Sequence, residues 1–190
     1  MKVIIDTNSL LSLVRYYLPF DKENLLFNFI KEKIEIGEII IIDKVYEQCT
    51  YNAKGLILKQ LAFLTDKSFL KKSKTPYKTD SLIAPSPAKF LRMVENQFVV
   101  GVQRKKINDV EFEVKKNQHL EDADIKLIVL CLNLIKNGEN VYLVTEETIG
   151  SNDNKLFVKI PVMCRELSIK CITLPKLIKL YLDDFELHFK

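Results

Sequence analysis

Val3-Ile4-Ile5-Asp6-Thr7-Asn8-Ser9-Leu10-Leu11 is a short apolar run that ends abruptly in polar residues. Continuous apolar runs of this length are typical of central strands in a parallel sheet, because helices cover both faces of such a strand. The next residues, 9–17, predict a helix. A buried strand that leads directly into a helix is the repeating unit of an α/β fold.

Further strands and helices alternate along the rest of the chain. Buried strands are predicted over residues 39–42, 141–144 and 169–174. Helices are predicted over residues 24–37, from about 45, and over 56–64, 86–97, 122–135 and 161–167. This alternation predicts one α/β domain over residues 1–190, with a central parallel sheet of four to five strands between two layers of helices.

Composition narrows the class of protein. The chain has 190 residues, of which 47% are hydrophobic and 28% charged, a balance that excludes a disordered or fibrous chain. No apolar run approaches the length of a membrane span, and the start Met1-Lys2 resembles no signal peptide. The four cysteines have no paired spacing, so we expect reduced thiols in a cytoplasmic protein. Because the sequence contains no membrane span, we expect no membrane partner.

The segment from about 66 to 119 is an extended basic insertion. Residues 71–87 read as a loop, and residues 98–118 are ambiguous. Val110, Phe112 and Val114 alternate with charged residues there, which is compatible with a hairpin strand or a poorly ordered excursion. The net charge of +4 is only mildly basic. Cations near a cleft would attract RNA phosphates, and the candidates are Lys71, Lys72, Lys74, Arg104, Lys105 and Lys106.

Acidic residues recur where predicted strands end and helices begin. They are Asp6 after the first strand, Glu47 after the second, Asp122 and Asp124 at the start of the 122–135 helix, and Glu146 and Glu147 after the third strand. In an open parallel sheet, ligands bind at the carboxyl edge of the strands, so these acids can converge on one cleft.

Converging carboxylates repel one another unless a cation lies between them. Oxygen ligands favour Mg²⁺ or Mn²⁺, and such an ion suits a nuclease or phosphatase. Each acid also has a simpler explanation on its own: an Asp after a strand often caps a helix, an acid in a first turn complements the helix dipole, and a glutamate pair can be solvated loop charge. The combination favours a metal site.

Three stretches, in this order, resemble motifs of the PIN-domain family. The opening residues 3–11 resemble its first strand and acidic motif, Asp124-Ile125-Lys126-Leu127-Ile128-Val129-Leu130 its acid-led helix, and Val144-Thr145-Glu146-Glu147 its strand-ending Thr-x-Asp/Glu motif. The resemblance runs from residue 1 to about 175, except in the middle. Residues 141–174 are similar to a bacterial and archaeal subgroup whose members resemble the toxin ribonucleases of toxin–antitoxin pairs.

The resemblance implies a PIN-like three-layer fold and a metal-dependent endoribonuclease that leaves a 5′-phosphate and a 3′-hydroxyl. It implies Mg²⁺ or Mn²⁺ as cofactor, RNA as substrate, and an antitoxin protein or a homodimer as partner. The implied metal ligands are Asp6, Asp122, Asp124 and Glu147, with Thr7, Asn8 and Thr145 orienting them. The implied catalytic acids are Asp6, Glu47, Asp124 and Glu147.

One position departs from the family pattern. The second acid of the family usually lies three residues after a helix-start valine; counted from Val45, that position is Gln48, whereas the carboxylate is Glu47. Adjacent helix positions point about 100° apart, so only one can face the cleft. Either the register is shifted and Glu47 serves, as we expect, or the site has lost a ligand.

The loss of a ligand leaves open a catalytically weakened PIN-like module that binds RNA or a protein partner. A phosphohydrolase with Asp6 as nucleophile is disfavoured, because no second aspartate follows two residues later. A dinucleotide site is disfavoured because no GxGxxG follows the first strand.

Overall fold

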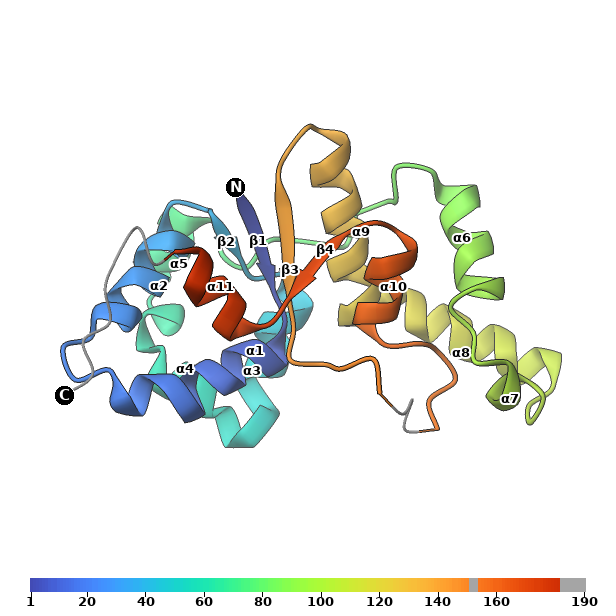
Figure 1. Ribbon diagram of the computed structural model, residues 1–190, viewed down its shortest axis with the longest axis horizontal. Coiled ribbons are helices and arrows are strands. Elements are labelled where there is room, and N and C mark those ends of the chain that lie inside the picture. Colours follow the sequence, from blue (N-terminus) through green and yellow to red (C-terminus); the bar gives the residue numbers. More distant parts are fainter. Residues whose placement is uncertain (151–153, 182–190) are drawn as a thin grey trace.

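The structure is a computed structural model that describes residues 1–150 and 154–181 (Figure 1). Its sheet is parallel throughout, and the strands lie in the order β2-β1-β3-β4. The strands are β1 (Lys2–Ile5), β2 (Ile39–Ile40), β3 (Val141–Val144) and β4 (Lys170–Ile172). Helices flank this sheet, so the predicted three-layer α/β/α fold with four to five parallel strands is confirmed.

The helices before the insertion cluster around β1 and β2 (Figure 1). The first, α1, continues into a π-helical turn, η1, and a 3₁₀ turn, η2. The elements are α1 (Thr7–Ser12), η1 (Leu13–Tyr17), η2 (Leu18–Phe20), α2 (Leu25–Glu35), α3 (Asp43–Tyr51), η3 (Asn52–Gly55), α4 (Leu56–Gln60) and η4 (Ala62–Thr65). Helix α2 packs against β2, and α1 packs against α3.

The remaining helices are α5 (Lys67–Ser73), α6 (Pro87–Asn96), α7 (Gly101–Arg104), α8 (Asp109–Glu121), α9 (Ala123–Lys136), α10 (Ile160–Glu166) and α11 (Leu174–Leu180). Helix α9 packs against β3, α8 and α10, and α10 packs against β4. Phe29 of α2 meets Tyr181, at the end of α11, with ring centroids 4.8 Å apart. This contact joins an early helix to the last one described.

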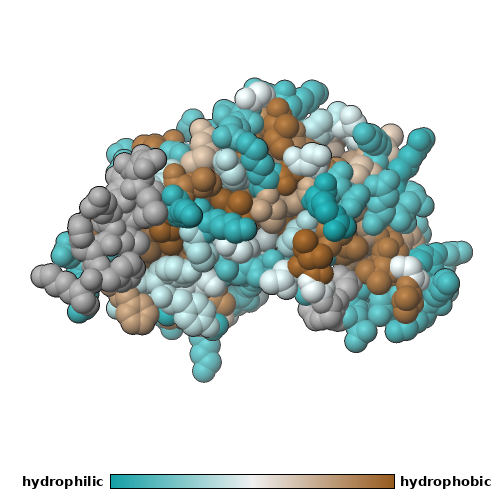
Figure 2. Space-filling view, viewed as in Figure 1, coloured by the Kyte–Doolittle hydropathy of each residue, from teal (hydrophilic) through white to brown (hydrophobic). Residues whose placement is uncertain are grey.

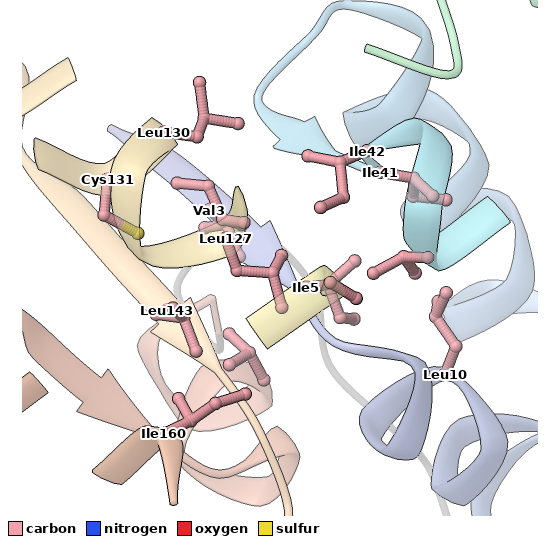
Figure 3. Packing of buried hydrophobic residues seen from close by; sticks show 14 of the residues in the cluster. Val3, Ile5, Leu10, Ile41, Ile42, Leu127, Leu130, Cys131, Leu143 and Ile160 are labelled. Carbon is pink, nitrogen blue, oxygen red and sulfur yellow. The ribbon is translucent and has the colours of Figure 1, made fainter. Parts of the chain in front are cut away.

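The core lies where α9 crosses β1 and β3. Val3, Ile4 and Ile5 are fully buried, as expected for a strand with neighbours on both edges and helices on both faces. Leu127, Leu130 and Cys131 of α9 lie beside Val3 and Leu143 (Figure 3). Burying an aliphatic side chain of this size contributes about 1.5–3 kcal/mol, so the start of α9 is firmly anchored. The acid-bearing first turn of α9 is therefore fixed relative to β1.

Residues 98–118 differ from both alternatives raised by the sequence, because most of them are helical, in α7 and α8. A capping box starts α8: Asn108 accepts from the Glu111 amide, and the Glu111 carboxylate accepts from the Asn108 amide. The buried positions of α8 are Phe112, Lys116 and His119. Their spacing is helical, and the valines that suggested a strand are exposed.

The basic insertion is tied to the rest of the domain. Lys116 pairs with Glu95 of α6 at 2.8 Å. The segment between α6 and α7 pairs with the chain after β3: the Val100 amide donates to the Leu156 carbonyl, and the Val158 amide to the Phe98 carbonyl, both at 2.8 Å. Residues 182–190 of the predicted single domain lie outside the described part of the chain.

Exposed hydrophobic side chains occur along much of the chain, and several of them belong to two groups of neighbouring residues. Near the N-terminus, Tyr16 and Phe20 are exposed. On α7 and α8, Val102, Val110 and Val114 are exposed, and Figure 2 shows hydrophobic surface on that side of the molecule. None of the helices within residues 1–150 and 154–181 has the length and apolarity that a membrane span requires.

Candidate metal centre

Asp6 lies at the point where the strand order of the sheet reverses. The chain passes from β1 to β2 on one side and from β3 to β4 on the other, so the crevice between β1 and β3 is the position at which open α/β sheets bind ligands. Asp6 follows β1 directly, and its amide donates to the Val144 carbonyl at 2.9 Å. Its Oδ1 accepts from the Thr7 amide at 2.7 Å and caps α1. The side chain is therefore fixed at the carboxyl edge of the sheet.

Thr145 connects Asp6 to the loop after β3. Its hydroxyl donates to Asp6 Oδ2 at 3.0 Å and accepts from the Glu147 amide at 3.2 Å. Thr145 is buried, as is Asp6. Burial raises the pKa of Asp6, the Thr145 hydroxyl and the amides of Thr7 and Asn8 lower it, and the Glu147 charge raises it, with a net rise.

Asp124 lies in the first turn of α9, where the charges on Asp6 and Glu147 affect its ionisation. Burial, followed by the charges on Asp6 and Glu147, raises the pKa of Asp124 to about 7. The charge on Lys155 acts in the opposite direction but does not compensate. Ionisation of Asp6 and of Asp124 is thus costly, because both are removed from water and the charge on Glu147 acts on each of them.

The two glutamates after β3 also accept hydrogen bonds from backbone amides at the starts of two helices. Glu147 Oε2 accepts from the Ile160 amide at the start of α10, at 3.0 Å. Glu146 Oε1 accepts from the Leu174 amide at the start of α11, at 2.7 Å. These contacts place acids at helix N-termini, where the dipole favours them. Glu147 therefore serves the fold as well as the acidic cluster.

The structure corrects the expectation for Glu47, which is exposed on α3. Gln48 is the residue that turns inward, where its Oε1 accepts from the Thr7 hydroxyl. The position that the PIN resemblance implies for a second acid, counted from Val45, is therefore the one that turns inward, and it carries an amide. The Thr7 hydroxyl is directed to Gln48, so Thr7 holds Asp6 through its backbone amide instead.

Two other predicted residues lie at the margin of the site. Asp122 is exposed, and its Oδ2 lies 3.4 Å from His119 Nδ1. Its charge contributes least among the causes that raise the pKa of Asp124. Asn8 is exposed and lines a hollow of about 270 Å³, whose wall is completed by Leu11, Ser12, Arg15, Tyr16, Glu146 and Glu147.

The predicted RNA-binding residues do not surround the acids. Lys72 pairs with Glu35 at 2.8 Å. Glu35 ends α2 shortly before β2 begins, so this pair and its neighbours Lys71 and Lys74 belong to the sheet edge opposite Asp6. Arg104 pairs with Asp109 and lies over the Phe112 ring, next to exposed Lys105 and Lys106.

Sequence reasoning missed Lys155, whose Nζ lies 3.8 Å from Glu147 Oε1. It sits in a polar stretch without periodicity, so no sequence signal marks it. A second hollow, of about 390 Å³, borders Thr145 and Glu147 and reaches Arg165 and Lys176. A larger hollow, of about 720 Å³, lies between α6 and α10 and contains none of the clustered acids, so size alone does not identify the site.

The donor set fits a hard divalent cation in its chemistry, because Asp6, Asp124 and Glu147 offer only oxygen ligands and repel one another without a counter-charge. As they stand, no three Asp, Glu, His or Cys side chains of the described residues form a group that could hold one ion. Glu147 Oε2 accepts a hydrogen bond from the start of α10, so this oxygen already has a partner within the fold.

Comparison with family models gives a match over most of the chain. Comparisons with curated proteins and with solved structures give none. The match is to the model described as "Domain of unknown function (DUF4411)" and covers residues 3–181, from β1 to the end of α11. It therefore includes every acid of the cluster. The chain belongs to this family, the DUF4411 domain.

Proposed function

We propose that this protein is a metal-dependent endoribonuclease that hydrolyses RNA phosphodiester bonds with Mg²⁺ or Mn²⁺. One observation supports the proposal: Asp6, Asp124 and Glu147 come from three separate elements near the switch point of a parallel sheet, and the charges on Asp6 and Glu147 act on Asp124. A structural role does not require a carboxyl group such as that of Asp124 to lie where burial and two neighbouring acids raise its pKa. A cation between them would turn this repulsion into attraction.

The residues have distinct tasks in this proposal. Asp6 and Asp124 are the two charges held at fixed positions, Asp6 by Thr145 and the α1 amides and Asp124 by the anchored start of α9. Glu147 is the adjustable third acid. When bound, a divalent ion supplies Lewis-acid activation of the phosphate and of the attacking water. Lys155 would screen the acids before the ion arrives.

The PIN resemblance in the sequence supports the same chemistry and suggests its setting. We propose a toxin-type PIN ribonuclease that is held inactive by an antitoxin protein or that works as a homodimer. The exposed hydrophobic side chains on η1, η2, α7 and α8 are suitable contact areas for either partner. All four cysteines are free thiols, which fits a cytoplasmic location.

A second candidate is a non-catalytic PIN-like module that binds RNA or a protein. Gln48 favours it, because the amide removes one formal charge from the set expected to bind the ion. The two candidates differ in one measurable property. Both bind a partner, but only the nuclease makes RNA cleavage depend on the ion.

The test is cleavage of a labelled single-stranded RNA by purified full-length protein in Mn²⁺, Mg²⁺ and EDTA. We expect cleavage with the ions, none in EDTA, and none with Asp6→Asn, which keeps the shape of the side chain and removes its charge. Glu47→Gln is the matched control, because it removes an exposed carboxylate from a neighbouring helix and should retain full activity. Cleavage that persists in EDTA or in Asp6→Asn would refute the proposal.

A further inference from the structure

One face of α1 and η1 leads away from the acids. Its residues recur at positions i, i+3, i+4, i+7 and i+8, which is the spacing of a single helical face. They are Asn8, Leu11, Ser12, Arg15 and Tyr16, and together with Glu146 and Glu147 they line the hollow of about 270 Å³. The hollow thus borders Glu147 of the acidic cluster and extends along α1 and η1.

The far end of this hollow offers a cation and an aromatic ring. Tyr16 is 64% exposed, and its hydroxyl has no hydrogen-bond partner among the described residues. Arg15 is exposed and forms no ion pair with any residue in the described ranges, although two glutamates line the same hollow. Arg104 and Arg165, by contrast, pair with neighbouring acids. Both side chains are therefore available to a ligand.

The backbone at this point is a π-helical turn, in which the Leu18 amide donates to the Leu13 carbonyl. Such turns are rare and are often found at functional sites. Leu13 and Val14 are buried and anchor the turn to the core, while Arg15 and Tyr16 project outward. The wall of the hollow is therefore fixed, and it presents the two side chains without an ordering cost for the backbone.

We propose that Arg15 and Tyr16 form a nucleotide subsite, in which Tyr16 stacks on an unpaired base and Arg15 pairs with the phosphate next to the one that is cleaved. This inference rests on the proposed function and names part of its substrate. An exposed ring suits an unpaired base, because a base inside a duplex has no free face to stack on it. The hollow is small for a ligand pocket, which limits it to about one nucleotide.

The test is direct binding of a labelled single-stranded RNA, measured by fluorescence anisotropy in EDTA so that no cleavage occurs. We expect Tyr16→Ala to weaken binding roughly 5- to 150-fold, since that is the effect of losing one stacked base, while Tyr16→Phe keeps the ring and the affinity. Arg15→Gln should weaken binding and lower the salt dependence by about one phosphate contact. Arg92→Gln, on the distant α6 hollow, is the charge control and should have no effect.

The outcomes separate this subsite from the proposed function. Unchanged affinity in both Tyr16→Ala and Arg15→Gln, or no single-strand binding by the wild type, would overturn the subsite even if Mn²⁺-dependent cleavage is seen. An equal loss by Tyr16→Ala on duplex RNA would overturn the stacking role. Reduced binding in both variants without cleavage by the wild type would keep the subsite and reject the nuclease.

Discussion

Replacement of Asp124 by Asn should stabilise the metal-free protein at neutral and higher pH. A carboxyl group whose pKa is higher in the folded than in the unfolded state binds its proton more tightly when folded, so stability falls as the pH rises between the two values. For Asp124 the interval runs from the ordinary 3.8 to about 7. Over this whole interval the raised pKa of Asp124 lowers the free energy of unfolding by about 4 kcal/mol at most. Asn carries no charge and escapes this loss.

The measurement is urea unfolding of both proteins in EDTA at pH 4 and pH 8. We expect Asp124→Asn to be more stable by about 2–4 kcal/mol at pH 8, and to differ from the wild type by less than about 1 kcal/mol at pH 4. Added Mn²⁺ should raise the stability of the wild type and leave the variant unchanged, because the ion binds only where the charge is present.

Glu47→Gln is again the matched control, since an exposed carboxylate should change stability by no more than about 0.5 kcal/mol at either pH. The comparison uses differences between proteins at the same pH, so titrations shared by both cancel. Equal stability of wild type and Asp124→Asn at pH 8 would refute the argument that burial and the neighbouring acids raise the pKa of Asp124. So would a gain at pH 8 that is matched by an equal gain at pH 4.

Two further substitutions test the surroundings of the cluster. Thr145→Val removes the hydroxyl that lowers the pKa of Asp6, so Mn²⁺ binding, measured by calorimetry, should require a higher pH. The substitution should also lower the free energy of unfolding by about 1–3 kcal/mol, because a buried carboxylate oxygen and the Glu147 amide lose a partner. Gln48→Glu should raise Mn²⁺ affinity and lower metal-free stability by restoring the missing acid, and unchanged affinity would show that position 48 does not face the ion.

The strands were predictable because each is a continuous apolar run bounded by polar residues. The run Val3 to Ile5 has to be covered on both faces, and it lies in the centre of the sheet with every side chain buried. The start of α9 was predictable for a similar reason. In these elements the local sequence pattern was sufficient, because the positions buried in the core have to be apolar.

The sequence misled where local pattern and tertiary contacts disagreed. Val110, Phe112 and Val114 alternate like a strand, but the capping box at Asn108 starts a helix, and the buried positions then follow helical spacing instead. Glu47 was expected in the site because it is a carboxylate, but it is exposed, and Gln48 is the residue of this turn that contacts Thr7. Lys155 could not have been found, since its position near Glu147 depends on the path of a non-periodic loop.

In the proposed nuclease, the hydrogen bond from the Ile160 amide to Glu147 would make an ion and a helix compete for one carboxylate. If Glu147 turns toward Asp6, the first turn of α10 loses its acceptor, and the free amide must find water instead. Ion binding at the sheet edge would then be measurable at Ile160, because the amide of this residue would exchange its hydrogen faster. Helix α10 packs on β4 and α9, so ion binding in the proposed nuclease would favour one arrangement of these helices and an empty site another.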